Sequence, residues 1–296
     1  MSDTLRVAFI GLGNMGAPMV ANLRKAGFPV KVYDRDPARM DLLVQRDGAI
    51  ACTDWQSLAQ GTHIVITMLP TGADVAHVLL HDRGGLAAHL QSHAVIIDMS
   101  SSEPLGTRAL AQHLAERGLP FVDAPVSGAV PGAIAGTLSI MAGADDPTAI
   151  DRVMPVFEAM GKRVFRTGAS GTGHAMKALN NYVAAAAYTA TAEALMIGAR
   201  FGLDDKQMVE IINASTGRSF NSEVVFASQV VTRQFETGFA MGLMTKDVGI
   251  ASQLGEALDV NAPVSRLVAD RWQAACEARG PDSDQCSAML AWEAGH

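Results

Sequence analysis

Short apolar runs alternate with amphipathic segments along roughly the first 165 residues of the chain. Runs of this kind, uninterrupted by polar positions, are typical of strands buried on both faces of a parallel sheet. The predicted strands are residues 5–10, 30–33, 63–68, 94–98 and 120–123, with two further strands at 138–142 and 163–166. Helical periodicity lies between them over residues 15–26, 37–46, 75–81 and 103–117. This alternation predicts an α/β fold of the Rossmann type with a doubly wound sheet.

The pattern changes near residue 165. Strand patterns stop, and helical periodicity follows over residues 174–201, 205–215, 242–258 and 263–278. We therefore predict a sheet-containing domain over residues 1–165 and an all-α domain over residues 166–296, which begins with a long interdomain helix. The apolar stretch 178–199 is long enough to cross a bilayer, but Asn180, Asn181 and Glu193 favour a helix buried inside the protein.

Composition and charge exclude several classes of protein. With 49% hydrophobic and 18% charged residues, the chain of 296 residues is globular rather than disordered. A net charge of −7 with no basic block argues against nucleic acid as a partner. Cys52, Cys276 and Cys286 are widely spaced and match no metal spacing, so they are expected to be free thiols in a reducing compartment. The N-terminus runs straight into a predicted strand, and we expect a cytoplasmic protein without a membrane segment.

A glycine-rich turn follows the first predicted strand and precedes the first predicted helix. It has the G-x-G-x-x-G spacing that binds dinucleotides, and its residues are Gly11, Leu12, Gly13, Asn14, Met15 and Gly16. The first glycine allows a tight turn, the second lets a pyrophosphate approach the backbone, and the third lets helix and strand pack closely. Backbone N–H groups at the helix start then face the phosphates. The alternative is a βαβ turn that binds no nucleotide.

The second predicted strand leads into Asp34 and Arg35, which bear on the choice of cofactor. A carboxylate eighteen residues after Gly16 is placed to bind a ribose 2′-hydroxyl and to repel a 2′-phosphate, which favours NAD. Arg35 is suited instead to receiving a 2′-phosphate, so NADP stays possible. Two further strand ends, residues 68–71 and 98–101, lie where parallel sheets bind ligands, although each pattern is also typical of a turn or a helix cap.

A second glycine-rich turn, residues 168–173, leads into the long helix that opens the second domain. This helix carries Lys177 and Asn181 four residues apart, and therefore on one face. The segment around them is otherwise apolar or small. Burial lowers the pKa of an amine, so a lysine there is suited to exchanging a proton near neutral pH. The alternative is a lysine that reaches the surface, or an ordinary lysine–asparagine pair.

Four segments in order resemble the β-hydroxyacid dehydrogenase family, and together they span almost the whole chain. They are residues 9–16, residues 123–138 from Asp-Ala-Pro-Val-Ser-Gly onward, residues 168–181, and the pair Lys246-Asp247. The resemblance implies that Lys177 is the catalytic residue, that Ser127 and Gly128 bind the substrate carboxylate, and that Asn181 orients the substrate. It implies cofactor contacts at Leu69, Pro70 and Ser101, and a place near cofactor and substrate for Lys246. The chain departs from the family at Ala129, where a second glycine often follows Gly128.

Together with this resemblance, these residues predict an NAD(P)-dependent oxidoreductase acting on a small 3-hydroxy acid or the matching semialdehyde. Lys177 is expected to take the hydroxyl proton during oxidation and to return it during reduction, with the carboxylate anchored by Ser127 and Gly128. The cofactor supplies the hydride chemistry, and no metal is required. His77 and His81 with the adjacent Asp82 suggest a metal face, but no further ligand is evident. The alternatives are an NADPH-preferring reductase of small aldehydes or imines, and a non-catalytic dinucleotide-binding protein. The resemblance also implies a homodimer or homotetramer.

Overall fold

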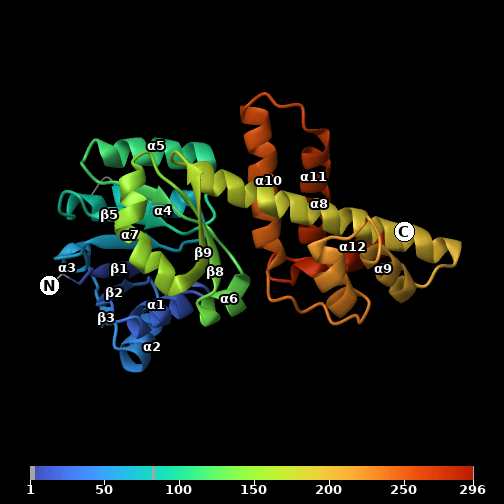
Figure 1. The fold of residues 1–296 in the computed structure, drawn as a ribbon, viewed down its shortest axis with the longest axis horizontal. Helices are drawn as coiled ribbons and strands as arrows, with labels where there is room; N and C mark the ends of the chain where they lie inside the picture. The colour runs from blue at the N-terminus through green and yellow to red at the C-terminus, as the bar shows by residue number, and fades with distance from the viewer. Residues whose placement is uncertain (1–3, 82–83, 296) are drawn as a thin grey trace. The chain divides into compact units, whose positions relative to one another are not determined.

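The computed structural model describes residues 4–81 and 84–295. The chain divides into two compact units, Met1–Lys177 and Ala178–His296, which are described separately. In Figure 1 the first unit runs from blue to yellow-green and the second from yellow to red. No described helix is both long and apolar enough to cross a membrane.

Among the described residues, the strands of the first unit form one nine-stranded sheet. They are β1 (Val7–Ile10), β2 (Val30–Tyr33), β3 (Ile50–Ala51), β4 (Ile64–Thr67), β5 (Val95–Asp98), β6 (Phe121–Asp123), β7 (Val126–Ser127), β8 (Leu138–Gly143) and β9 (Gly161–Gly168). Their order is β3-β2-β1-β4-β5-β6-β8-β7, and β9 also pairs with β8. The chain therefore starts near the middle of the sheet and builds outward to both sides, which is the doubly wound arrangement.

Helices cover both faces of this sheet. They are α1 (Gly16–Lys25), α2 (Pro37–Asp47), α3 (Trp55–Ala59), α4 (Gly72–Leu80), η1 (Leu86–Ala88), α5 (Pro104–Ala115), α6 (Ala129–Ala135) and α7 (Pro147–Met160). Alternate residues of one strand belong to two separate cores. Val7 and Phe9 pack in the cluster that includes residues of α1, α2 and α7, whereas Ala8 and Ile10 pack in the cluster that includes residues of α4 and α5. A strand buried on both faces needs apolar residues at every position, which explains the unbroken runs in the sequence.

Local sequence sets the ends of several of these helices. Asp36 caps α2 by accepting a hydrogen bond from the Ala38 N–H, Pro37 occupies the first turn, and Gly48 ends the helix in the left-handed conformation. Thr71 and Asp74 form a reciprocal capping box at the start of α4. These caps fix where α2 and α4 begin and where α2 ends.

The regular elements of the second unit, among its described residues, are helices. One isolated antiparallel β-bridge joins Ala240 and Asp284. The helices are α8 (Thr172–Phe201), which begins in the first unit, α9 (Asp205–Asn213), the π-helix η2 (Asn221–Val230), α10 (Met241–Ala257), α11 (Pro263–Arg279), η3 (Gln285–Ser287) and α12 (Ala288–Ala294). Tyr188 lies in an aromatic cluster with Phe226, Trp272 and Trp292, at ring-centroid distances of 4.6, 5.5 and 5.9 Å. The Tyr188 hydroxyl donates to the Cys286 carbonyl at 2.6 Å, so its polar end is satisfied inside this core.

The structure confirms the predicted fold class and corrects the prediction in two respects. The sheet is not parallel throughout, because β8 runs antiparallel to β6 and β7. Elements that the sequence analysis does not predict include β3, β7, α6, α7, η1, η2, η3 and α12. The short strands β3 and β7 have two residues each, which is too few for a periodic pattern to emerge.

Candidate active site

The glycine turn between β1 and α1 has the geometry of a phosphate cradle. Gly11 has a φ of +95°, and a Cβ on it would lie 2.2 Å from the Met68 carbonyl oxygen. A Cβ on Gly16 would lie 1.9 Å from the Gly11 carbonyl oxygen. Both positions therefore need glycine. Gly13 differs, because the described atom nearest to a Cβ there would be Arg39 Nη1 at 3.7 Å, so a ligand can approach its backbone.

The start of α1 completes this cradle. Its N-cap residue, Met15, makes no side-chain cap hydrogen bond, and the first turn of this fully described helix carries no acidic residue. Leu12 is buried in the sheet core, Asn14 is exposed and Met15 is half-buried. Uncapped N–H groups at a helix N-terminus favour an anion. The turn thus fits the pyrophosphate of a dinucleotide.

Asp34 lies against the same turn. Its Oδ2 accepts a hydrogen bond from the Leu12 N–H at 2.7 Å, and its Oδ1 accepts one from the Asp36 N–H at 2.9 Å. Arg35 is exposed. Arg39, which the sequence analysis does not single out, places Nη1 4.0 Å from Asp34 Oδ2 while its side chain stays 52% exposed. The structure thus brings a carboxylate and a guanidinium together beside Gly13, at the place where a ribose is expected.

The loops that follow β4 and β5 are joined by a hydrogen bond. The Leu69 N–H donates to Ser100 Oγ at 2.9 Å, and Ser100 is buried. Pro70 is exposed and the predicted contact Ser101 is half-buried. Both loops lie at the carboxyl ends of neighbouring parallel strands, where open α/β sheets bind their ligands. Ser100, which the sequence analysis does not single out, thus joins the two loops.

The predicted carboxylate loop has a strained backbone. Ser127 ends β7 and is half-buried, and Gly128 takes a φ of +133°. Ala129, which opens α6, has a φ of +50° in the left-handed region. That conformation costs an alanine about 1 kcal/mol and a glycine almost nothing. The departure from the family pattern therefore falls at a position whose backbone suits glycine.

The first turn of α8 is anchored by Asp123, at the end of β6. The Asp123 carboxylate accepts hydrogen bonds from the Gly171 N–H at 2.7 Å and the His174 N–H at 2.9 Å. A Cβ on Gly173 would lie 2.3 Å from the Met141 carbonyl oxygen, so the helix approaches β8 closely only with glycine there. Burial raises the pKa of Asp123, and the nearby His174 and the two N–H donors oppose that rise. Lys177 follows one turn later and is 8% exposed.

In the second unit, Asn181 is held by Asp247. The Asn181 Nδ2 donates to Asp247 Oδ2 at 2.6 Å, and both side chains are buried. Lys246, the preceding residue on α10, is half-buried. Because Asp247 accepts from the amide nitrogen of Asn181, the amide oxygen of Asn181 is turned away from that carboxylate. This amide oxygen accepts a hydrogen bond from Asn180 Nδ2 at 3.2 Å.

Four residues with clear structural links to the predicted site escape the sequence analysis as individual candidates: Arg39, Asp123, His174 and Asp247. Asp123, His174 and Asp247 stand inside the motifs that carry the family resemblance. A carboxylate at a strand end or next to a motif lysine is the signal that could have found Asp123 and Asp247. Arg39 has no such signal, and neither has His174 despite its place in residues 168–181, because the partners of both side chains lie on other elements.

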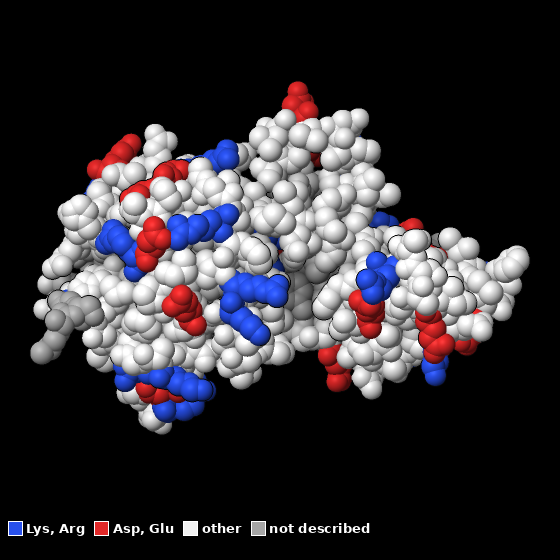
Figure 2. All heavy atoms as spheres, viewed as in Figure 1, with Lys and Arg blue, Asp and Glu red and all other residues white. Residues whose placement is uncertain are grey.

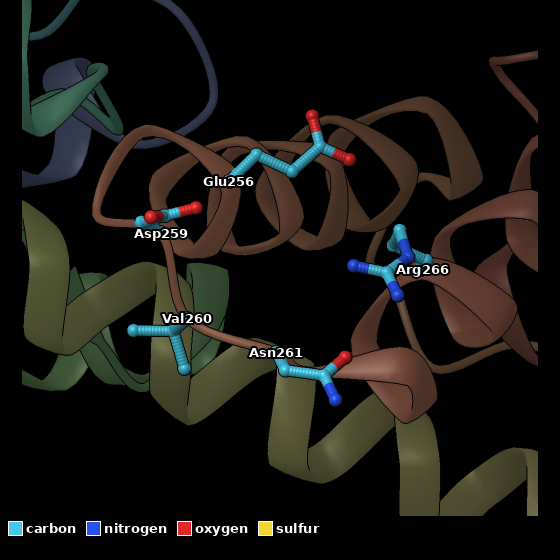
Figure 3. A pocket seen from close by; sticks show the side chains of 5 residues that line it. All are labelled: Glu256, Asp259, Val260, Asn261 and Arg266. Atoms are coloured by element: carbon cyan, nitrogen blue, oxygen red, sulfur yellow. The ribbon is translucent and has the colours of Figure 1, made fainter.

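No metal centre is built by the described residues, among which no group of three or more His, Cys, Asp or Glu side chains could hold an ion. His77 and His81 stack edge to face with ring centroids 4.5 Å apart, and Asp82 lies outside the described residues. A surface hollow of about 310 Å³ lies at the α10–α11 connection. It is lined by Glu256, Asp259, Val260, Asn261 and Arg266 (Figure 3). Its mixed charges lie on residues that belong to none of the predicted motifs.

Comparison with known proteins adds two family matches. Residues 6–168 match the NAD binding domain of 6-phosphogluconate dehydrogenase, and residues 171–292 match the NAD-binding model of NADP-dependent 3-hydroxyisobutyrate dehydrogenase. Together with the sheet and the glycine turn, these matches define a nicotinamide-dinucleotide-dependent oxidoreductase. The chain belongs to the β-hydroxyacid dehydrogenase family.

Individual relatives cover nearly the whole chain. The 2-(hydroxymethyl)glutarate dehydrogenase of Eubacterium barkeri is 36% identical over 99% of this chain and 96% of its own length. The NAD-dependent L-serine dehydrogenase of Pseudomonas aeruginosa is 38% identical over 88% of this chain and 89% of its own. The structure of Mycobacterium tuberculosis 3-hydroxyisobutyrate dehydrogenase with L-serine superimposes with a TM-score of 0.90, at 31% identity over 98% of this chain and 99% of that one.

Proposed function

We propose that this chain transfers hydride between a nicotinamide cofactor and a small 3-hydroxy acid, or the matching semialdehyde. The observation that carries the proposal is a buried lysine, Lys177, on the helix turn that Asp123 anchors at the carboxyl ends of the sheet strands. A glycine cradle for a dinucleotide lies at the ends of the same sheet. A non-catalytic dinucleotide-binding protein has no need of that lysine.

The substrate class follows from what the named substrates of the relatives share. 3-Hydroxyisobutyrate, L-serine and 2-(hydroxymethyl)glutarate each carry a hydroxymethyl group on the carbon next to a carboxylate. They differ in the third substituent of that carbon, which is a methyl, an amino or a carboxyethyl group. We propose that this chain acts on the shared hydroxymethyl carboxylate unit.

The proposed residues bind the two ends of the hydroxymethyl carboxylate group, the carboxylate and the hydroxyl, separately. Ser127 and Gly128 bind the carboxylate through a hydroxyl and backbone N–H groups, which fixes the distance to the reacting carbon. Lys177 Nζ takes the hydroxyl proton during oxidation and returns it to the oxygen during reduction. Asn181, oriented by Asp247, binds the substrate, and Lys246 contributes near the cofactor. The nicotinamide ring supplies the hydride acceptor when it is bound.

For the cofactor, we propose contacts at the residues 11–16 turn, at Leu69, Pro70 and Ser101, and at Asp34, with NAD preferred over NADP. Asp34 supports this preference because its buried carboxylate repels a 2′-phosphate. Arg35 and Arg39 beside it leave NADP usable at lower efficiency. We also propose that residues 1–165 bind the cofactor and that residues 166–296 form a helical domain for substrate binding and dimerisation.

A substrate panel tests the proposed function. Purified protein is assayed with 3-hydroxyisobutyrate, both enantiomers of serine and 2-(hydroxymethyl)glutarate, each with NAD and with NADP, and nicotinamide absorbance reports turnover. We expect oxidation of at least one of these acids, with NAD giving the higher kcat/KM. The matched control is the methyl ester of the best acid, which lacks the carboxylate charge and should react at least tenfold more slowly. Turnover that favours small aldehydes or imines without a carboxylate would contradict the proposed substrate class.

We propose that the chain forms at least a homodimer through its second unit. Large apolar side chains stand exposed along the end of α8 and on α9, with Ile197 71%, Phe201 87% and Ile211 58% exposed. On the face drawn in Figure 2, Lys and Arg groups lie beside Asp and Glu groups on each unit, between broad uncharged areas. Light scattering should give a mass at least twice the chain mass of 31.1 kDa, and Phe201→Glu should lower it. A wild-type mass of one chain would contradict this proposal.

We further propose that the protein works in a reducing compartment such as the cytoplasm. Cys52, Cys276 and Cys286 are all free thiols in the structure, and Cys52 and Cys286 are buried. Protein unfolded in denaturant should therefore react as three thiols per chain without prior reduction.

A further inference from the structure

A buried cluster of two carboxyl groups and a histidine joins the start of α8 to the ends of two strands in the first unit. Asp98 ends β5 and Asp123 ends β6, and their side chains are 1% and 0% exposed. His174, whose side chain is also inaccessible, places Nε2 3.6 Å from Asp98 Oδ2 and Nδ1 4.0 Å from Asp123 Oδ2. Buried carboxylates are costly unless donors or positive charge face them. His174 supplies a basic ring between the two.

The orientation of this ring follows from its other partner. Thr107, on α5, has Oγ1 2.8 Å from His174 Nδ1, and the same hydroxyl donates to the Glu103 carbonyl oxygen at 3.1 Å. The threonine oxygen is therefore the acceptor for an N–H at Nδ1. This contact turns Nε2 toward Asp98. No described atom makes a hydrogen bond to Nε2, and Asp98 Oδ2 faces it at 3.6 Å, so the ring is held by α5 on one side and faces β5 on the other.

From Asp98 the contacts continue into the loops proposed to bind the cofactor. Its carboxylate accepts hydrogen bonds from Thr67 Oγ1 at 2.9 Å, the Ser100 N–H at 3.0 Å and Ser102 Oγ at 2.9 Å. Ser100 Oγ in turn accepts from the Leu69 N–H. One chain of polar contacts thus links α8 to the strand ends of β4 and β5.

We propose that His174 is a positioning residue, which fixes the first turn of α8, and with it Lys177, against the loops at the ends of β4 and β5. Residues three apart on a helix move together, because the backbone hydrogen bonds make one turn rigid. Misplacing the lysine by about 1 Å is enough to slow proton and hydride transfer by up to about 100-fold. The kinetic test of this inference rests on the proposed function. The hydrogen-exchange test does not, because it rests on the structure of the first unit alone.

Steady-state kinetics of two His174 variants form the first test. His174→Leu removes the contacts of the ring with Thr107 and Asp98. The kcat should then fall on the order of 10- to 100-fold, with KM changed less than threefold. His174→Gln should restore kcat to within about fivefold of wild type, because its amide N–H can donate to Thr107 Oγ1. NADH affinity, measured by fluorescence, should stay within about twofold in both variants, since the glycine cradle is untouched.

Thr107→Val tests the same contact from the other side, with Thr62→Val as its matched control. Both threonines are buried and donate to the carbonyl four residues earlier, Glu103 and Leu58 respectively. Thr107 alone of this pair contacts His174. Thr107→Val should lower kcat at least fivefold and Thr62→Val less than twofold. The double variant His174→Leu/Thr107→Val should be no slower than the slower single variant, because both remove one shared contact.

Hydrogen exchange gives a readout that needs no turnover. Thr107→Val should raise the exchange rate of the backbone amides of residues 171–177, although the substitution lies on α5, and Thr62→Val should not. If the wild-type protein turns over no 3-hydroxy acid, the proposed function fails, and exchange still decides whether His174 anchors α8. A kcat of His174→Leu within threefold of wild type, additive losses in the double variant, or unchanged exchange at residues 171–177 would each overturn the inference.

Discussion

Lys177→Ala should lower kcat on the order of 1,000-fold while leaving the affinity for NADH within about twofold of wild type. Positioned general acid–base groups contribute about 10²- to 10⁴-fold to rate, and no other proposed site residue is a lysine on α8. Cofactor affinity should persist because the glycine turn and Asp34 belong to other elements. Stopped-flow absorbance of the nicotinamide measures the loss, and fluorescence titration measures binding.

Two comparisons separate a proton-transfer role from loss of packing. Lys162→Ala, at an exposed position on β9, makes the same chemical change outside the proposed site and should keep kcat within twofold. Added methylamine should partly restore turnover to Lys177→Ala, because a small amine fits the space left by the side chain and can move the proton. Turnover of Lys177→Ala within tenfold of wild type would remove Lys177 from the proposed mechanism.

Asp34→Asn should shift cofactor preference toward NADP by on the order of 100-fold in the ratio of kcat/KM values. That factor corresponds to about 2.7 kcal/mol, which is reasonable for removing a carboxylate that faces a phosphate dianion at close range. The substitution also frees Arg39, whose Nη1 lies 4.0 Å from Asp34 Oδ2, to pair with a 2′-phosphate. The ratio is measured with both cofactors at a fixed saturating concentration of the best substrate.

The matched control for this change is Asp47→Asn, at the far end of α2. It removes the same charge from the end of α2, outside the proposed cofactor contacts, so it reports any general effect of net charge on cofactor binding. Its ratio should stay within threefold of wild type. A ratio for Asp34→Asn equal to that of Asp47→Asn would show that Asp34 does not select the cofactor.

Long periodic segments of the fold could be predicted from the sequence, and short or tertiary features could not. Strand β1 is apolar at every residue, and helix α8 is a long segment with helical periodicity, so both can be recognised in the sequence. β8 is predicted as a strand, but its antiparallel pairing with β6 and β7 depends on which chain segment reaches that edge of the sheet. α7 did carry a readable start signal, because Asp146 caps it and Pro147 opens it.

The site divides along the same line. The glycine turn and Asp34 are singled out by local spacing, and Lys177 by the family resemblance, and the role of each in binding or catalysis stays a prediction. The partners that hold these residues cannot be predicted, because Asp123 and His174 are 51 positions apart, and Asn181 and Asp247 are 66 positions apart. Two side chains at such separation meet only through the folded backbone. Arg39 could not be predicted for the same reason, although it is close to Asp34 in sequence. Its position beside Asp34 depends on the direction in which α2 runs from the end of β2.

Asp123 places a constraint on how this enzyme can diversify. The residue begins the segment that leads to Ser127 and Gly128, and its carboxylate also caps the helix that carries Lys177. A substitution of Asp123 that reshapes the proposed carboxylate loop would therefore also loosen the helix turn that carries Lys177, the proposed base. New substrate ranges, natural or engineered, are consequently accessible by varying the loop after Asp123 or the second unit, while Asp123 itself stays fixed.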